Sequence, residues 1–394
     1  MNKKKIFNDP LYGLIGFDHE IIYKLIDHPF FQRLRRIKQM GLADYVYPSA
    51  NHTRFSHSLG ALYLLKKSIE TLKWKGVEIS DEEYKAASIS ILLHDIGHSP
   101  FSHSLEKVFL PLSHEEMSLK LMHKLNDEFD GELEMAIQMF QGKYHRQFFH
   151  QLISGQVDVD RLDYLTRDSF FTGVAEGVVG YDRIIKMFNV IEDKLVIEEK
   201  GVYSIEKFLI ARKIMYWQVY MHKTSIVADK MLNILLNYTL NEAHEKDFNL
   251  LPESLKVFKE IEDIEDKVLK LTKIDDSDIV FALKNLVRSG DELIWFLSNG
   301  LLKRKLLKII FTDSKIDKEN INTLISKSEL SKSLSDKTKE KLFITGSEVN
   351  DIYNSNIDDE ILILSKNGEI EPISKYIQFL ANMYKSVKYF GIYI

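Results

Sequence analysis

Apolar residues recur at helical spacing through most of the first 240 positions of the chain. This pattern predicts a helix over 20–40 that a proline interrupts, and a second helix over 58–74. The stretch 82–96 is nearly all apolar in its second half, which favours a central helix buried on every side. Gly97 and Pro100 should end that helix.

The next segments read as more helices with one hairpin between them. Ser113 and Glu116 form a capping-box pattern, which predicts a helix start. A further helix is expected over 158–166, and one long helix over about 205–242. Residues 195–204 alternate around a Lys-Gly pair, which predicts a β-hairpin.

Beyond about residue 245 the chain is rich in Lys and Glu and mixes helical patterns with short strands. Strands are expected at 308–311, 360–364 and 387–393, and Asn367-Gly368 is a hairpin signal. The stretch 326–341 holds five Lys and five Ser and should be a solvated surface. The expected fold is therefore mainly α. A helical bundle with a small β-hairpin fills 1–243, and an α+β lobe of unassigned role fills 244–394.

Composition narrows the class of protein. A length of 394 residues favours a main domain plus a smaller lobe, and 45% hydrophobic with 28% charged residues is ordinary for a globular protein. The basic N-terminus is followed by no apolar segment, so a cytoplasmic protein without a membrane partner is expected. The net charge of −5 makes nucleic acid an unlikely partner. Without Cys, the strong metal ligands available are His and carboxylates.

Candidate chemistry is concentrated in one stretch of the sequence. Four histidines fall within 21 residues: His94, His98, His103 and His114. Burying an ionised Asp95 at the end of an apolar helix would cost several kcal/mol, roughly, unless a cation meets it. With His57 and Asp160 from other helices, a site of two His and two Asp would form. Such ligands suit one divalent ion, Mn, Fe, Co, Ni, Zn or Mg.

These residues match the H…HD…D pattern of the HD-domain superfamily. The surrounding sequence motifs are more specific: Ile37-Lys38-Gln39, 53–60 (TRFSHSLG), 94–103 (HDIGHSPFSH), Ser113-His114-Glu115, 158–164 (DVDRLDY) and Arg167-Asp168. From about residue 5 to 223 the chain resembles the branch of dNTP triphosphohydrolases, which includes the animal HD-domain dNTPase and bacterial dGTPase-like enzymes. The resemblance implies an HD-domain bundle that converts a dNTP and water into a deoxynucleoside and triphosphate.

The resemblance also implies a role for each matching position. His57, His94, Asp95 and Asp160 would bind the metal. His103 and His114 would be the catalytic histidines, oriented by Glu106 and Glu115. The substrate would contact Gln39, Arg54, His98, Arg161, Tyr164, Asp168, Arg212, Tyr220 and Lys223. Of these, Gln39 and Asp168 would read the sugar 3′-hydroxyl, and Tyr164 would exclude a 2′-hydroxyl. Arg212, Tyr220 and Lys223 should share one face of the long helix.

A regulatory site is a second implication. Lys5, Ile6, Asp27, Gln32 and Arg35 match the segment that binds a guanine nucleotide in activated relatives, so GTP or dGTP is a possible effector. The resemblance further implies an allosteric homo-oligomer, a dimer or tetramer. Two other functions stay open from the residues: another HD nucleotide phosphohydrolase, namely a nucleotide phosphatase or phosphodiesterase, and a non-catalytic binder of nucleotides or nucleic acid.

Overall fold

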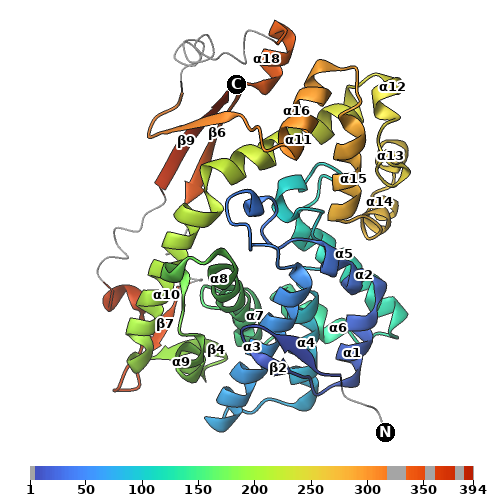
Figure 1. Ribbon diagram of the computed structural model, residues 1–394. Helices are drawn as coiled ribbons and strands as arrows, with labels where there is room; N and C mark the ends of the chain where they lie inside the picture. The colour runs from blue at the N-terminus through green and yellow to red at the C-terminus, as the bar shows by residue number, and fades with distance from the viewer. Residues whose placement is uncertain (1–4, 317–333, 351–359, 378–385, 394) are drawn as a thin grey trace.

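The computed structural model describes residues 5–316, 334–350, 360–377 and 386–393. The described chain is mainly α-helical, with three small sheets, which confirms the expected fold class (Figure 1). The helices of the N-terminal half are α1 (Glu20–Asp27), α2 (Pro29–Gln32), α3 (Arg54–Trp74), α4 (Asp81–Leu93), α5 (His114–Glu128), α6 (Glu134–Phe140), α7 (Gln147–Ser154), α8 (Val159–Thr172) and α9 (Tyr181–Lys186). A short hairpin, β1 (Phe7–Asp9) and β2 (Gly13–Ile15), precedes them.

Three of these helices form the scaffold for the site. α3 packs against both α4 and α8, and α4 is buried along most of its length, as its apolar sequence predicts. The capping box at Ser113 and Glu116 is present at the start of α5. The expected helix over 58–74 begins four residues earlier, at Arg54, and the one from Asp158 continues to Thr172.

The turn of the hairpin lies at 192–193, eight residues before the predicted turn at 200–201. β3 (Phe188–Ile191) pairs with β4 (Lys194–Glu198), and Glu192 and Asp193 form the turn with φ of 50° and 56°. Two consecutive left-handed residues are typical of the type I′ hairpin turn, which these residues enter without glycine. The Lys200-Gly201 pair instead forms a 3-10 turn before α10, so the prediction of a hairpin around it was wrong.

The long helix expected over 205–242 is also wrong, because it is broken in the middle. α10 (Val202–Met215) continues into a π-helical turn, η6 (Tyr216–Tyr220), and α11 (Lys223–Asn241) then starts again. His222 between them is extended, and its side chain caps α11 by accepting a hydrogen bond from the Thr224 amide. Residues on either side of this break therefore do not share one helical face.

The C-terminal part combines helices with two sheets. Its helices are α12 (Glu245–Phe248), α13 (Glu253–Glu260), α14 (Ile264–Leu271), α15 (Asp276–Leu286), α16 (Glu292–Leu302) and α18 (Asp336–Leu342). β5 (Lys308–Thr312), β9 (Ser386–Tyr393) and β6 (Ile344–Asn350) form an antiparallel sheet in that order. The strand predictions at 308–311, 360–364 and 387–393 are confirmed. For the surface prediction over 326–341, residues 326–333 lie outside the described residues.

The end of the chain returns to the N-terminal half. β7 (Leu362–Leu364) adds in parallel to β4, and β8 (Ile370–Pro372) follows it through a turn in which Gly368 has φ +84°. The hairpin prediction at Asn367-Gly368 is thus confirmed. Buried apolar residues form one cluster from Ile15 to Ile392, so the domain boundary at 243 stays a prediction.

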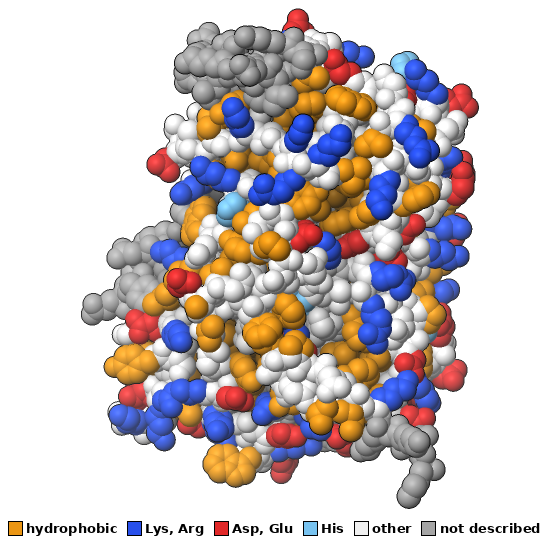
Figure 2. Space-filling model, viewed as in Figure 1, with side chains coloured by type: hydrophobic (Ala, Val, Ile, Leu, Met, Phe, Trp, Pro, Cys, Tyr) orange, Lys and Arg blue, Asp and Glu red, His pale blue; other side chains and the backbone are white. Residues whose placement is uncertain are grey.

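Two surface properties bear on partners. On the face shown in Figure 2, basic and acidic side chains are interspersed, and apolar side chains reach the surface between them. Among the residues that the structure describes, no helix is both long enough and apolar enough to cross a lipid bilayer.

Candidate metal and nucleotide site

Four residues from three helices meet at the centre of the bundle. His57 comes from α3, His94 caps the end of α4 with Asp95 next to it, and Asp160 stands in the first turn of α8. Asp160 Oδ1 lies 3.0 Å from His57 Nε2 and 3.4 Å from His94 Nε2. The carboxylate oxygens of Asp95 lie 3.5 and 3.6 Å from these same nitrogens of His94 and His57, respectively. The structure thus brings together all four residues of the expected metal site.

The protonation pattern of the two imidazoles favours a cation between them. His94 Nδ1 lies 2.6 Å from the Ile91 carbonyl, which can only accept, so Nδ1 carries the proton. His57 Nδ1 likewise donates to Asp163 Oδ2 at 2.8 Å. When both rings are neutral, each presents an Nε2 lone pair, and the two Nε2 atoms are 3.3 Å apart. Two lone pairs and a carboxylate that face one another fit a divalent metal ion.

A buried ion-pair chain supports His57 from behind. Asp163 accepts hydrogen bonds from Nε and Nη2 of Arg167, both at 2.9 Å, and Arg167 Nη1 donates to Asp9 at 2.9 Å. Burial opposes protonation of His57, but the hydrogen bonds that the ring donates to Asp160 and Asp163 outweigh it and raise the pKa of His57 to about 10. A metal must therefore compete with a proton for Nε2.

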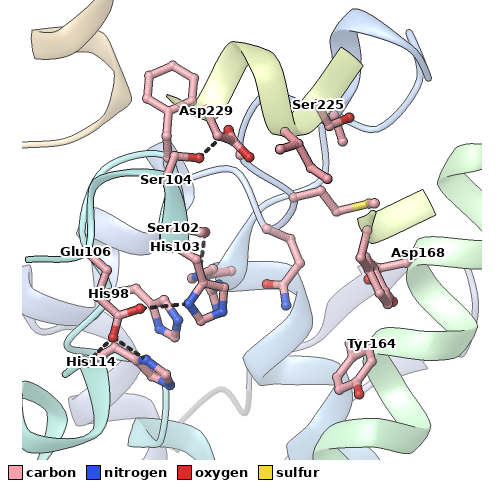
Figure 3. Close-up of a pocket in the computed structure, with 18 of the residues that line it drawn as sticks. His98, Ser102, His103, Ser104, Glu106, His114, Tyr164, Asp168, Ser225 and Asp229 are labelled. Atoms are coloured by element: carbon pink, nitrogen blue, oxygen red, sulfur yellow. Dashed lines mark hydrogen bonds and ion pairs between the residues drawn. The ribbon is translucent and has the colours of Figure 1, made fainter. Parts of the chain in front are cut away.

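A second histidine cluster lies beside the first. His98 stacks on His114 with ring centroids 4.1 Å apart, and His103 meets both rings edge-on (Figure 3). Glu106 accepts hydrogen bonds from Nδ1 of His103 at 3.0 Å and Nδ1 of His114 at 3.1 Å. These two hydrogen bonds lower the pKa of Glu106, so this carboxylate stays ionised and orients both rings.

Tight backbone geometry brings this cluster close to the metal ligands. A side chain at Gly97 would meet the Ser118 amide at 2.3 Å, so only glycine allows α5 to approach this closely. Phe101 and Ser102 then have φ of 54° and 56°, an uncommon conformation for residues other than glycine. Such strain persists where the surrounding structure holds it in place.

Asp95 and Asp160 of the first cluster and the whole second cluster line one cavity of about 780 Å³. Its wall includes three of the expected sugar-reading residues, Gln39, Tyr164 and Asp168, together with Tyr220. Tyr164 and Asp168 lie across the cavity from the histidine cluster (Figure 3). The Asp168 carboxylate is held by His52 Nε2 and by the Tyr220 hydroxyl, each at 2.7 Å. Gln39 Oε1 is buried there without a hydrogen-bond partner.

The expected cationic contacts are placed unevenly. Arg54 lines the cavity, where it donates to Asp95 and, at 2.7 Å, to Ser102 Oγ. Arg161 is tied to Asp158 and, at 2.5 Å, to the Gly155 carbonyl. Arg212 keeps a buried Nη1 without a hydrogen-bond partner. Both arginines lie near Tyr164, since their positive charge acts on its hydroxyl, but neither lines the cavity.

Two further expected site residues are exposed and lie outside the cavity lining. The Lys223 side chain is exposed and does not line the cavity, because the chain turns at Met221 and His222 instead of continuing as one helix. Glu115 is also exposed outside the cavity lining, since its place in the first turn of α5 directs it to solvent. Glu106 is the carboxylate that accepts from both His103 and His114.

Sequence reasoning missed three carboxylate or imidazole groups around the cavity. His52 supports Asp168, as described above. Asp229 of α11 lines the cavity and accepts from Ser104 Oγ at 2.6 Å, and burial raises its pKa to about 7. Asp276 of α15 reaches the cavity walls from the C-terminal part. His52 lies just before the TRFSH motif, and this position could have indicated that it belongs to the site. Asp229 and Asp276 stand in no motif.

The residues expected at a regulatory site lie outside the cavity lining. Lys5 and Asp27 form an ion pair, and Ile6 is 64% exposed. Gln32 Oε1 accepts from Arg35 Nε at 2.9 Å, while the Arg35 guanidinium lies 3.6 Å above the centre of the Phe55 ring. The effector role of this group stays a prediction.

Comparison with known proteins agrees with this geometry. The HD domain family model matches residues 54–168, and the HD associated region matches 179–253. The uncharacterized protein YwfO of Bacillus subtilis is 31% identical over 79% of this chain and 72% of its own length. The Dictyostelium discoideum homolog of the deoxynucleoside triphosphate triphosphohydrolase SAMHD1 is 31% identical over 68% of this chain, which covers about half, 54%, of that protein.

Among solved structures, a phosphohydrolase from Bacteroides thetaiotaomicron is similar over the whole of both chains, with 41% identity and a TM-score of 0.92. A hypothetical protein from Aquifex aeolicus is 27% identical with a TM-score of 0.74. The matched HD domain spans the residues that form the two histidine clusters. The chain belongs to the HD-domain family of phosphohydrolases.

Proposed function

We propose that the protein is a metal-dependent dNTP triphosphohydrolase, which converts a dNTP and water into a deoxynucleoside and inorganic triphosphate. The observation that carries this proposal is the composition of one cavity. Asp95 and Asp160 of the metal group, the catalytic candidates His103, Glu106 and His114, and the sugar-side residues Gln39, Tyr164 and Asp168 all line it. A nucleotide in this cavity would have its phosphates and its sugar beside different chemical groups.

His57, His94, Asp95 and Asp160 are the residues that would hold the metal. A divalent ion bound there polarises a phosphoryl oxygen and lowers the pKa of a bound water. Arg54 adds fixed positive charge beside the same site for the α-phosphate. Asp95 holds that guanidinium, so its position does not depend on substrate.

Glu106 and its two histidines would handle the proton. Breakage of the bond between the α-phosphorus and the 5′-oxygen leaves an alkoxide that must gain a proton. His103 and His114 each donate Nδ1–H to Glu106, which leaves Nε2 as the position that carries a proton toward the leaving oxygen. The ionised Glu106 stabilises whichever ring is positively charged.

Other residues around the site would select the sugar and hold the triphosphate. Gln39 and Asp168 line the cavity and would read the 3′-hydroxyl, and Tyr164 would pack against C2′, so that a ribose hydroxyl would clash. Arg161, Arg212 and His98 would contact the phosphates, and Tyr220 the sugar. The names of the SAMHD1 relatives, dNTP triphosphohydrolases, support this choice of substrate over other phosphate esters.

A product assay tests the proposal. Purified protein is incubated with each dNTP and with the matching NTP, in Mn²⁺ or Mg²⁺, and triphosphate, pyrophosphate and phosphate are separated. Triphosphate with an equal amount of deoxynucleoside, and little turnover of NTPs, is the expected result. Single phosphates alone, or turnover of monophosphates or cyclic nucleotides instead, would reject it in favour of another HD phosphohydrolase.

The same assay addresses regulation. We propose that GTP or dGTP acts as an effector through Lys5, Ile6, Asp27, Gln32 and Arg35, in a homo-oligomer. Addition of GTP to a dATP assay is expected to raise the rate and to increase the sedimentation coefficient. Equal rates and equal sedimentation with and without GTP or dGTP would remove this part of the proposal.

A further inference from the structure

Two irregular segments form the cavity wall that carries the catalytic candidates. Residues 37–42 contribute Gln39, and residues 98–105 contribute His98 and His103. The first runs beside 52–54 through a single bridge, Lys38 to Thr53. The second contains the left-handed pair Phe101 and Ser102 and only one 3-10 turn, Ser102–Leu105. Regular secondary structure therefore does not fix either segment.

A carboxylate from the C-terminal part ties these segments together. Asp276, the first residue of α15, accepts the Lys38 amide on Oδ2 at 2.9 Å and the Phe101 amide on Oδ1 at 2.6 Å. Asp276 is buried, and the N-cap of α15 is served by Asp275, which accepts from the Ser277 amide. The Asp276 carboxylate therefore does not cap α15 and instead links the two segments of the wall.

Neighbouring contacts make this a junction of three parts of the chain. The buried Arg33 donates Nε to the Ile274 carbonyl and Nη2 to the His98 carbonyl, each at 2.7 Å. Ser102 Oγ donates to the Lys38 carbonyl at 2.6 Å, which links the two segments directly. The start of α15 and the residue before its cap thus hold residues 98–103 at two points. Ile274 is linked to His98 through Arg33, and Asp276 binds the Phe101 amide.

Burial raises the pKa of Asp276 to about 6, so its carboxylate is still ionised at neutral pH. An ionised carboxylate has acceptor sites on both oxygens, and charge-assisted hydrogen bonds from amides are stronger than neutral ones. One of its two donors is the amide of Phe101, the first residue of the strained pair. Loss of that acceptor would leave a buried amide unpaired and would favour relaxation of the left-handed backbone.

We propose that Asp276 is a positioning residue for the reaction, through which the C-terminal lobe holds both segments of this cavity wall in place. It contacts neither the metal group nor the space for substrate in the described residues. It acts on Gln39 through Lys38 and on His103 through Phe101 and Ser102. The lobe that the sequence left without a role is then part of the active centre.

The test compares Asp276→Asn, Asp276→Ala and a matched control, Asp278→Asn, in the full chain. Asp278 lies two residues away in the same helix cap, where it accepts from the Asp275 amide at 2.9 Å and contacts neither wall. Turnover, KM, metal content and thermal unfolding are measured for each. Because the inference rests on the proposed reaction only for its substrate, the assay uses whichever phosphate ester the wild type cleaves.

Asp276→Asn is expected to lower kcat about tenfold to a hundredfold, the size typical of a small misplacement of reacting groups. Its metal content should equal that of the wild type. Asp276→Ala should lose more, because the Asn oxygen still accepts one of the two amides, and Asp278→Asn should keep wild-type kcat. A folded Asp276→Ala with wild-type kcat and KM overturns the proposal. So does an Asp276→Asn that fails to fold, or that loses no more activity than Asp278→Asn.

Discussion

The two histidine clusters of the cavity use the same residue types for different chemistry. In the metal group, the Nδ1 atoms of His57 and His94 donate outward to Asp163 and the Ile91 carbonyl, so their Nε2 lone pairs face each other 3.3 Å apart. In the catalytic group, His103 and His114 both donate to a single carboxylate, Glu106. The first arrangement leaves room for a cation, and the second stabilises a proton.

Exposure separates the clusters further. The His57 side chain is 1% exposed, whereas His103 is 63% exposed toward the cavity and solvent. A buried set of ligands keeps its ion, and an accessible imidazole can exchange protons with water and substrate. The position of the nearest carboxylate, more than the number of histidines, therefore distinguishes the two clusters.

Removal of a metal ligand should have the largest effect. Asp160→Ala takes away the carboxylate that contacts both Nε2 atoms and is expected to abolish turnover and metal retention together. Metal content is measured by elemental analysis beside activity. Glu115→Gln, an exposed carboxylate outside the cavity, is the control and should retain both. Full activity in Asp160→Ala would contradict the assignment of the metal site.

Glu106→Gln should separate the two clusters. Loss of this charge removes the group that orients His103 and His114, so turnover should fall about a hundredfold to ten-thousandfold, the usual contribution of positioned acid–base groups. Because Glu106 has no contact with His57, His94 or Asp160, metal content should not change. A parallel loss of metal would show that the clusters act as one.

Much of this division could be predicted from the sequence, because short motifs encode it. His94 and Asp95 follow the most apolar helix of the chain, and the histidines of the second cluster follow within 20 residues. Local patterns also gave α3, α4 and the caps of α5 and α8. The mainly α class was confirmed for this reason: apolar periodicity is a local property.

The remainder depends on contacts between distant residues. Asp276 and Asp229 reach the cavity from helices that carry no motif, and nothing near them in sequence indicates a buried partner. The break at Met221–His222 follows from a π-helical turn that apolar spacing does not reveal, and it moved Lys223 away from the cavity. The hairpin was misplaced because a type I′ turn formed at Glu192-Asp193 without glycine.

A smaller effect is expected from the support behind the metal group. Asp163→Asn weakens the acceptor for His57 Nδ1–H and should lower metal affinity about tenfold to a hundredfold, as loss of such partners usually does. Isothermal titration of the metal-free protein measures it. Asp9→Asn weakens the other ion pair of Arg167 without touching His57 and should leave metal affinity unchanged. Equal losses in both variants would assign the effect to general stability.

The smallest effect concerns a cavity carboxylate that faces no imidazole. Asp229 accepts from Ser104 and from the Leu42 amide, yet burial raises its pKa to about 7. Its pKa in the folded protein therefore lies above the unfolded value near 3.8, so the folded state binds this proton more tightly. The contribution of Asp229 to stability is then present below the unfolded pKa and is lost as pH rises from about 4 to about 7.

Asp229→Asn removes this titration and should raise the unfolding temperature relative to the wild type by more at pH 8 than at pH 5. The expected gain is on the order of 1 kcal/mol, or about 2–4 °C for a domain of this size class. Ser104→Ala should have the opposite sign, since loss of the hydroxyl donor raises the pKa of Asp229 further. A difference in melting temperature between Asp229→Asn and wild type that does not change from pH 5 to pH 8 would mean that Asp229 stays ionised. It would then resemble Glu106 of the catalytic group, whose carboxylate is held in its charged form by its donors.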